Sequence, residues 1–254
     1  MRGIDISNWQ GGLDLANVAR SNRLQFVFLK ATEGISFVDK YCNGWISAAK
    51  SAGLLFGFYH YARNNNPEAE AEHFVKHTKG YFKDGIPVAD IEEQQSAAWV
   101  SRFVERVYKL TGVYPMIYCS ASYCSTFKNS DVYKKCGLWV AGYPRPYTSF
   151  IDSKMPYNIA PWTNAAIWQF TADLKLSGWN GKLDGDIAYI TPDQWNTYAN
   201  GGPVKGKTHE QNIVAACKVI CGDYGNGDER IKKLTADGYN ASSVQSLVNA
   251  ILKL

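Results

Sequence analysis

Two kinds of apolar pattern alternate along the first part of the chain. Short unbroken apolar runs predict buried β-strands, and the stretches between them repeat apolar residues every three or four positions, as amphipathic helices do. The predicted strands are Gly3–Ile6, Phe26–Lys30, Leu54–Tyr61, Ile86–Glu92, Tyr114–Cys119, Leu138–Ala141, Ala166–Phe170 and Leu183–Ile190. Alternation of strands and helices favours a parallel sheet. About eight strands within roughly 200 residues favour a closed, modified (β/α) TIM-like barrel.

The helical pattern is most regular directly after the fourth predicted strand. The positions expected to face inward there are Trp99, Val100, Phe103, Val104, Val107 and Tyr108. Connections become irregular after Cys119, so we expect the second half of the barrel to depart from strict alternation.

The pattern changes near residue 200. The Gly/Pro/Lys-rich stretch that begins at Gly201 predicts a linker over residues 201–209. Residues 210–254 are predicted to form three short helices, the first with an apolar stripe of Ile213, Ala216, Cys217 and Ile220. This divides the chain into a barrel domain at 1–200, a linker and a small helical module. Such a module is typically a targeting device, and the alternative is a structural extension packed on the barrel.

Composition and charge limit the partners. The chain has 46% hydrophobic residues but no apolar run of membrane-spanning length, so we expect no membrane partner. A net charge of +4 suits an anionic polymer such as a cell wall, and the lack of a basic run gives no reason to expect nucleic acid. No basic stretch followed by an apolar one opens the chain. We therefore expect synthesis in the cytoplasm and release by another route, of the holin type, unless a leader was removed.

The six cysteines have no paired Cys-x-x-Cys spacing, so they do not predict a zinc site. We interpret them as small apolar residues of a protein made in the cytosol, and disulfides remain open because their number is even. Cys217 and Cys221 are one helical turn apart, which suggests packing on one face. No metal or other cofactor is expected.

The strongest chemical feature is a pair of carboxylates, Asp90 and Glu92, at the end of a predicted buried strand. Residues two apart on a strand share a face, which places the pair roughly 7 Å apart along the backbone. Two neighbouring carboxylates repel each other, so one pKa is raised. A raised acid is what glycoside hydrolysis needs to protonate the leaving oxygen. The alternative is a solvated loop that carries acids by chance.

Other strand ends supply a matching set of side chains, since barrel active sites lie at the carboxyl ends of the strands. Candidate substrate contacts are Tyr59, His60, Tyr61, Tyr118, Trp139, Tyr143 and Gln169. Because the first strand of a closed barrel neighbours the last, Asp5 and Asp184 could meet beside the Asp90–Glu92 pair. Of four carboxylates around one cleft, the least solvated would stay protonated as the acid and the others would stay charged.

Five stretches resemble glycoside hydrolase family 25, the Chalaropsis-type lysozymes found among phage endolysins and bacterial autolysins. They are Gly3–Gln10, Phe28–Gly34, Gly57–Tyr61, Val88–Glu92 and Ile167–Phe170, in the family's order up to about residue 200. The resemblance implies an N-acetylmuramidase that cleaves the β-1,4 bond between N-acetylmuramic acid and N-acetylglucosamine of bacterial peptidoglycan. It also implies a retaining mechanism, with either a protein carboxylate or the substrate's acetamido group as the second participant.

The resemblance assigns roles residue by residue. It places the general acid on Glu92, and it matches Asp90 and Asp5 to the family's other acidic positions. The family commonly ends its barrel with an Asp-Leu-Asn-like motif, whereas this chain has Leu-Asp-Gly-Asp at residues 183–186. Asp184 is our choice for the fourth acid, and Asp186, which we also expect to contact substrate, is its rival.

The C-terminal part resembles the CW_7 cell-wall-binding repeat of some endolysins, through Tyr224–Arg230, Gly238-Tyr239 and Val244–Asn249. The resemblance implies binding of the muropeptide, here by one copy of the repeat. We expect Asp228 and Arg230 to contact the cell-wall ligand, and Asp228 is also placed to cap a helix.

Two other classes of function compete with a muramidase. A carbohydrate-binding barrel without catalysis is one, but a lectin has no need for the Asp90–Glu92 pair. A metal-dependent phosphoesterase is the other, because His73 and His77 are one helical turn apart. Neighbouring glutamates make a solvated, charged helix face the better interpretation of these histidines.

Overall fold

The computed structural model of the chain describes residues 1–201, 209–237, 239 and 241–252. The chain divides into two compact units, Met1–Pro203 and Val204–Leu254. The linker predicted at 201–209 lies largely outside the described residues. In the described segments, no helix is both long enough and apolar enough to cross a bilayer.

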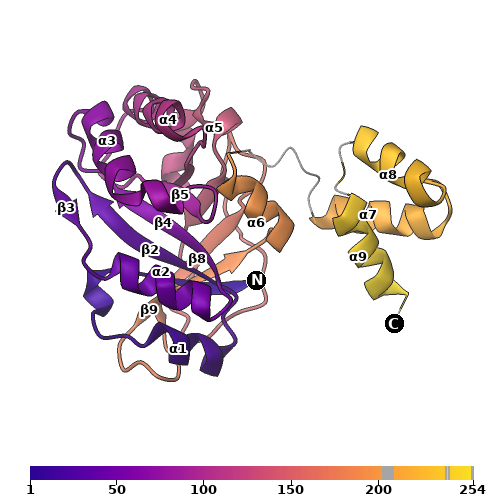
Figure 1. Cartoon of the computed structure of the whole chain (residues 1–254), viewed down its shortest axis with the longest axis horizontal. Helices are drawn as coiled ribbons and strands as arrows, with labels where there is room; N and C mark the ends of the chain where they lie inside the picture. Colours follow the sequence, from indigo (N-terminus) through magenta and orange to yellow (C-terminus); the bar gives the residue numbers. More distant parts are fainter. Residues whose placement is uncertain (202–208, 238, 240, 253–254) are drawn as a thin grey trace. The chain divides into compact units, whose positions relative to one another are not determined.

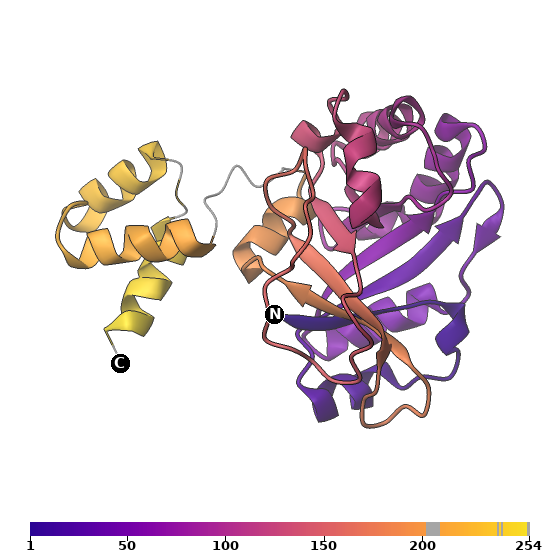
Figure 2. The same ribbon diagram turned by 180° about the vertical axis from the view of Figure 1, so that it is seen from behind.

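The first unit is a closed barrel (Figures 1 and 2). Its strands are β1 (Arg2–Ile6), β2 (Phe26–Glu33), β3 (Phe37–Val38), β4 (Leu55–Tyr61), β5 (Ile86–Asp90), β6 (Met116–Ser120), β7 (Leu138–Ala141), β8 (Ile167–Leu174) and β9 (Leu183–Ala188). Within the described residues they form one nine-stranded sheet in the order β1-β9-β8-β7-β6-β5-β4-β2-β3, and pairing of β1 with β2 closes it. Only β3 stays outside the closure, so eight strands form the barrel and the predicted fold class is confirmed.

The barrel departs from a parallel arrangement at its last strand. Strand β9 runs antiparallel to both β8 and β1, whereas the pairings from β1 through β2 and β4 to β8 are parallel. The connection from β8 to β9 covers residues 175–182, which is too short for the crossover that a parallel strand needs. Residues 142–166, between β7 and β8, contain no helix or strand. The expected irregularity after Cys119 is therefore confirmed.

Helices cover the outside of the strands (Figure 1). They are α1 (Leu15–Asn22), α2 (Cys42–Ser51), α3 (Pro67–Thr78), α4 (Ala97–Thr111), α5 (Val132–Lys135) and α6 (Pro192–Ala199), with 3-10 turns η1 (Asn8–Gln10), η2 (Lys79–Tyr81) and η3 (Ala121–Phe127). The inward face predicted for α4 is buried except at Tyr108, which is 41% exposed. Tyr108 instead stacks on Tyr114, with ring centroids 4.1 Å apart, because it lies in the last turn of the helix, beyond the core.

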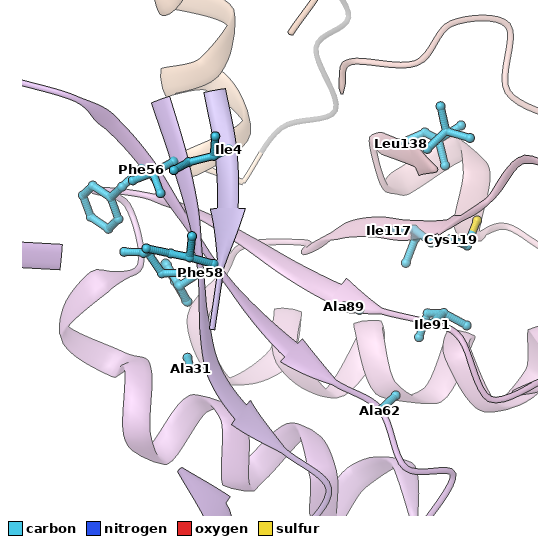
Figure 3. Packing of buried hydrophobic residues seen from close by; sticks show 14 of the residues in the cluster. Ile4, Ala31, Phe56, Phe58, Ala62, Ala89, Ile91, Ile117, Cys119 and Leu138 are labelled. Carbon is cyan, nitrogen blue, oxygen red and sulfur yellow. The ribbon is translucent and has the colours of Figure 1, made fainter. Parts of the chain in front are cut away.

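Alternate side chains of the strands fill two apolar layers. The outer layer packs under the helices, and Figure 3 shows part of it, including Ile4, Phe58 and Ile117. The inner layer fills the barrel, where Phe28 stacks on Trp139 at 4.3 Å between ring centroids. Trp195 of α6 packs on the ring of Phe28 as well. Large apolar side chains thus fill the barrel up to the carboxyl ends of the strands, where polar side chains take over.

The second unit contains α7 (His209–Ile220), α8 (Gly227–Ala236) and α9 (Ala241–Ile251) around a small apolar core. The stripe predicted for the first helix is wrong at three of its four positions, because Ile213, Cys217 and Ile220 are exposed. Only Ala216 of that stripe is buried, beside Ala215 and Val219. The core is so small that alanines fill it at the closest approach of the helices.

The cysteines are free thiols. Cys42, Cys119, Cys124 and Cys136 are buried in the barrel unit, as expected for small apolar residues. Cys217 and Cys221 are exposed, so the shared packing face predicted for them is wrong.

Candidate active site

Asp90 and Glu92 lie at the carboxyl end of β5. Asp90 is the last residue of the strand and is 5% exposed, whereas Glu92 is exposed. Neighbouring strands hold the backbone between them: Ile91 N donates to Tyr118 O at 2.9 Å, and Ala62 N donates to Asp90 O at 3.0 Å. The strand ends two residues earlier than predicted, yet the fixed backbone still presents Glu92 to solvent above a buried Asp90.

Asp90 is the member of the pair whose protonation is perturbed. Burial raises its pKa well above the ordinary value, and the charge of Glu92 and a side-chain hydrogen bond with it raise the pKa further, while Lys30 lowers it. No described residue gives Asp90 Oδ1 a hydrogen bond. A carboxyl group in such a place keeps its proton. The expectation that one pKa of the pair is raised is met at Asp90, the less solvated acid of the two, and not at Glu92, to which the resemblance assigns the general acid.

A second group of carboxylates comes from β1 and β9. Asp5 and Asp184 are direct partners in the antiparallel register, and Asp186 pairs with Gly3 two positions away, on the same face. Burial raises the pKa of Asp184 to about 6, and the charges of Glu92 and Asp173 raise it as well. The effect of Glu92 shows that the β5 acids and the β9 acids share one site, as expected for a closed barrel.

Asp184 and Asp186 differ in access. Asp186 is fully buried, and its Oδ1 accepts a hydrogen bond of 2.8 Å from Trp139 Nε1. Asp184 is only partly buried. Asp5 is 7% exposed, and burial, followed by the charges of Asp184 and Asp186, raises its pKa well above the ordinary value. Only Asp184 of these three offers substantial surface to a ligand.

Gln169 connects these acids to the tyrosines. Its Nε2 donates to Asp5 Oδ2 at 2.7 Å, and its Oε1 accepts from Tyr118 Oη at 2.7 Å and from Tyr143 Oη. Gln169 and Tyr118 are buried, whereas Tyr143 is 47% exposed. The hydrogen bonds fix the amide orientation and make this group a support beneath the site, with Tyr143 at its surface.

Tyr59 and Tyr61 on β4 face the acids. Burial raises the pKa of Tyr61 to about 12, and the charges of Glu92 and Asp90 contribute. Burial also raises the pKa of Tyr59, and the charges of Asp5 and Asp90 raise it further. Tyr59 therefore lies between the two groups of carboxylates, and Tyr61 lies beside the Asp90–Glu92 pair.

His60 lies elsewhere, and its predicted contact with substrate is wrong. It is fully buried and points away from the tyrosines on either side of it, since side chains alternate along a strand. Its Nδ1 is 2.8 Å from Thr32 Oγ1 and its Nε2 is 2.9 Å from Glu70 Oε2. Trp139 is likewise 2% exposed, so it supports Asp186 from below and has no surface for a sugar ring.

Lys30 belongs to the site but was not predicted. Its ammonium lies 2.5 Å from Glu33 Oε2 and 5.0 Å from the ring centroid of Tyr61, and it lowers the pKa of Asp90. Lys30 is 7% exposed. A lysine at the end of the apolar run from Phe26 was the available signal, because a buried ammonium requires a partner.

The histidine pair on α3 has no metal-binding geometry. His73 Nε2 is 2.8 Å from the backbone oxygen of Phe37, and the His73 and His77 rings meet edge to face at 4.8 Å. In the part of the chain that the structure describes, no group of three or more His, Cys, Asp or Glu side chains could hold a metal ion.

The two residues predicted to bind the cell wall have different surroundings. Arg230 donates to Gly225 O at 2.9 Å, to Gln245 Oε1 at 2.8 Å and to Asn226 Oδ1 at 2.7 Å. Its guanidinium therefore joins the start of α8 to α9. Asp228 is exposed in the first turn of α8, and the N-cap is Asn226, so the capping role predicted for Asp228 is wrong.

Comparison with known proteins finds matches to two separate parts of the chain. Residues 4–179 match the family model described as glycosyl hydrolases family 25, and residues 214–252 match the CW_7 repeat. The chain is 34% identical to an autolytic lysozyme of Clostridium acetobutylicum over 149 residues, which are 56% of this chain and 45% of that protein. It is 30% identical to lysozyme M1 of Streptomyces globisporus over 205 residues, which are 72% of this chain and 66% of that protein.

The matches thus span between about half and two thirds of the length of these relatives. Among solved structures, the bacterial lysozyme of Streptomyces coelicolor superimposes with a TM-score of 0.67 at 25% identity, covering 79% of this chain and 97% of that one.

Proposed function

The chain belongs to the glycosyl hydrolases of family 25, and we propose that it is an N-acetylmuramidase. In this proposal it hydrolyses the β-1,4 bond between N-acetylmuramic acid and N-acetylglucosamine in bacterial peptidoglycan, outside the cell that it lyses. The observation that supports this most is the exposed Glu92 beside the buried Asp90, whose pKa is raised by burial and by the charge of Glu92, with Asp184 at the same end of the barrel. Paired carboxyl groups of unequal protonation are the machinery of glycoside hydrolysis.

Glu92 is the proposed general acid, because it is the member of the pair that a substrate can reach. Burial, the charge of Glu92 and a side-chain interaction with it raise the pKa of Asp90, so in this proposal the two carboxyl groups titrate as a pair and not independently. As the glycosidic bond breaks, Glu92 transfers its proton to the leaving oxygen. Asp90, kept neutral, places no second negative charge beside the newly formed carboxylate.

The other acids would stabilise the positive charge that develops on the sugar. Asp184 is ionised above a pH of about 6 and is partly exposed, so it is the proposed fourth acid, with Asp5 in support. Tyr61 and Tyr143 are the proposed ring contacts at the surface. Tyr59, Tyr118 and Gln169 form the polar support beneath, and Asp186 belongs to it through Trp139.

The second candidate is a peptidoglycan-binding protein without catalysis. It accounts for the tyrosines but gives no reason to bury Asp90 next to Glu92, an arrangement that costs stability. Digestion of purified peptidoglycan separates the two. After reduction of the products with borohydride, mass spectrometry should find reduced muramic acid ends. Reduced glucosamine ends would move the cut to the other glycosidic bond, and wall binding without products would support the second candidate.

The helical module is proposed to hold the enzyme on the wall. Its match to a single CW_7 repeat supports this, and Asp228 on its surface is available to a ligand, whereas Arg230 maintains the fold. Removal of the residues after Pro203 should weaken binding to whole cell walls more than hydrolysis of soluble fragments. Unchanged wall binding after that deletion would contradict the targeting role.

A further inference from the structure

Trp9 is the most exposed large hydrophobic residue in the part of the chain that the structure describes, and the proposed mechanism does not explain its exposure. It lies in η1, directly after β1, and 83% of its surface is exposed. A tryptophan can bury a large apolar area, and leaving it in water forgoes that gain. Exposed apolar surface grouped beside a functional site is characteristic of a binding surface.

The backbone around Trp9 is held firmly, so the exposure is not the result of a frayed turn. Ser7 Oγ accepts from Trp9 N at 3.3 Å and Gln10 Oε1 accepts from Ser7 N at 2.9 Å, which together form a capping box. Buried Asp39 accepts from Asn8 N at 2.7 Å through Oδ2. The turn is therefore tied to itself and to the segment that follows β3. A ligand would find the indole already in place.

A second exposed aromatic side chain lies near this turn. β3 pairs with the end of β2, and Phe37, opposite Glu33, is 39% exposed on the face that Lys30 shares. Val38, opposite Thr32, points to the other face. Asp39, whose carboxylate accepts from the Trp9 turn, is the next residue of the chain. We call Trp9 and Phe37 the β3 rim; β3 is labelled in Figure 1.

The β3 rim is continuous with the candidate active site. Lys30 Nζ lies 5.4 Å from the ring centroid of Phe37 and 5.0 Å from that of Tyr61, so it is shared by the two rings. Tyr61 in turn lies beside the Asp90–Glu92 pair. On the other side, Trp9 follows Asp5 by four residues, and four residues span at most about 14 Å. One extended polymer could therefore contact the carboxylates and the indole together.

We propose that the β3 rim forms an outer sugar subsite, which binds the glycan strand beyond the bond that is cleaved. This inference rests on the proposed muramidase function, because the occupant is the same glycan chain. The C–H faces of a sugar ring pack on an aromatic ring. Trp9 would then set the preference for long glycan strands over short ones and leave the bond-breaking step unchanged.

The test compares the wild type with Trp9→Ala and Trp9→Phe on two uncrosslinked glycan oligomers. They consist of two and of four N-acetylglucosamine–N-acetylmuramic acid units, and so are a tetrasaccharide and an octasaccharide. The matched control is Leu110→Ala, which removes a 39% exposed apolar side chain from α4. Trp9→Ala should lower kcat/KM on the octasaccharide by about tenfold, which corresponds to about 1.4 kcal/mol. The loss should lie in KM. It should be much smaller on the tetrasaccharide, and Trp9→Phe and Leu110→Ala should stay near the wild type.

Two results would overturn the subsite. One is a wild-type kcat/KM on both oligomers in Trp9→Ala, and the other is an equal loss on both, which would place Trp9 at the cleaved bond. The melting temperature of Trp9→Ala should match that of the wild type, since the side chain is exposed. If the wild type releases no reduced muramic acid ends from either oligomer, the muramidase proposal fails and the subsite fails with it. If only the length dependence is absent, the muramidase proposal stands.

Discussion

Gln169 on β8 donates a hydrogen bond of 2.7 Å to Asp5 on β1, although 164 positions separate them in the sequence. The same amide accepts hydrogen bonds from Tyr118 on β6 and from Tyr143 after β7. One side chain thus ties together four parts of the barrel rim and fixes the position of an acid. In the proposed site, these hydrogen bonds would position Asp5 for its role beside the exposed acids.

Gln169→Glu tests the support. The new carboxylate still accepts from both tyrosines, but it cannot donate to Asp5 and adds a negative charge beside it. We expect kcat/KM on peptidoglycan to fall at least about tenfold, because a misplaced acid costs transition-state stabilisation. The steady-state rate of muropeptide release measures this.

The matched control is Gln25→Glu, at an exposed side chain that accepts from Arg2 N at 3.0 Å and can still do so as a glutamate. It should keep the wild-type rate. Equal rates in the two variants would show that the bond between Gln169 and Asp5 does not position the site.

Asp184→Asn tests the electrostatics through stability. Burial raises the pKa of Asp184 from an ordinary 3.8 to about 6, so between these values the folded protein holds a proton that the unfolded chain has released. Folding therefore becomes less favourable as the pH rises from about 4 to 6. The asparagine variant lacks this penalty. The free energy of unfolding of Asp184→Asn should therefore rise relative to that of the wild type between pH 4 and 6. At pH 7 the difference should be on the order of 1–3 kcal/mol.

Urea unfolding of both proteins at pH 4, 5, 6 and 7 measures the effect. Asp152→Asn, at an exposed position, serves as the control and should follow the wild type at each pH. A difference between Asp184→Asn and the wild type that does not change with pH would contradict the raised pKa.

Arg230 and Asp228 test the helical module. Arg230→Ala removes hydrogen bonds to Gly225, Asn226 and Gln245, and it should lower the stability of this unit by roughly 1–3 kcal/mol. Asp228→Ala touches no such network and should leave stability unchanged while weakening binding to cell walls. Circular dichroism melting and sedimentation with purified walls separate the two effects. Equal melting temperatures for the two variants would contradict a structural role for Arg230.

The convergence of the acids could be predicted from the sequence. Asp5 and Asp90 lie at the carboxyl ends of apolar strands, and closure of a barrel brings such ends together. Asp184 lies at the start of β9, and it reaches the same rim because β9 runs antiparallel to β1. What the sequence could not supply was the direction of the last strand. Because β9 runs antiparallel, Asp184 and Asp186 lie two register positions apart, opposite Asp5 and Gly3 of β1, and only the structure distinguishes the accessible acid from the buried one.

The face of a buried strand was also beyond prediction. Tyr59, His60 and Tyr61 are all compatible with either side of β4, since both sides of a barrel strand are covered. His60 turned out to bind Glu70 under the helices, and the two tyrosines turned out to face the acids. The exposure of Trp9 was equally hidden, because a tryptophan in a sequence is expected in a core.

The most direct test of the central claim compares Glu92→Gln with Glu93→Gln. The two glutamates are adjacent, but Glu93 pairs with the exposed Arg63 and has no place in the proposed mechanism. Loss of general acid catalysis should slow Glu92→Gln by about 100- to 10,000-fold. Loss of an exposed ion pair should leave Glu93→Gln within about threefold of the wild type.

The measurement is the time course of reduced muropeptides released from purified peptidoglycan, followed by mass spectrometry, with both variants shown to be folded. The account predicts reduced muramic acid ends from the wild type and from Glu93→Gln, and almost none from Glu92→Gln. Turnover by Glu92→Gln at the rate of Glu93→Gln would contradict the assignment of Glu92 as the acid that breaks the glycosidic bond.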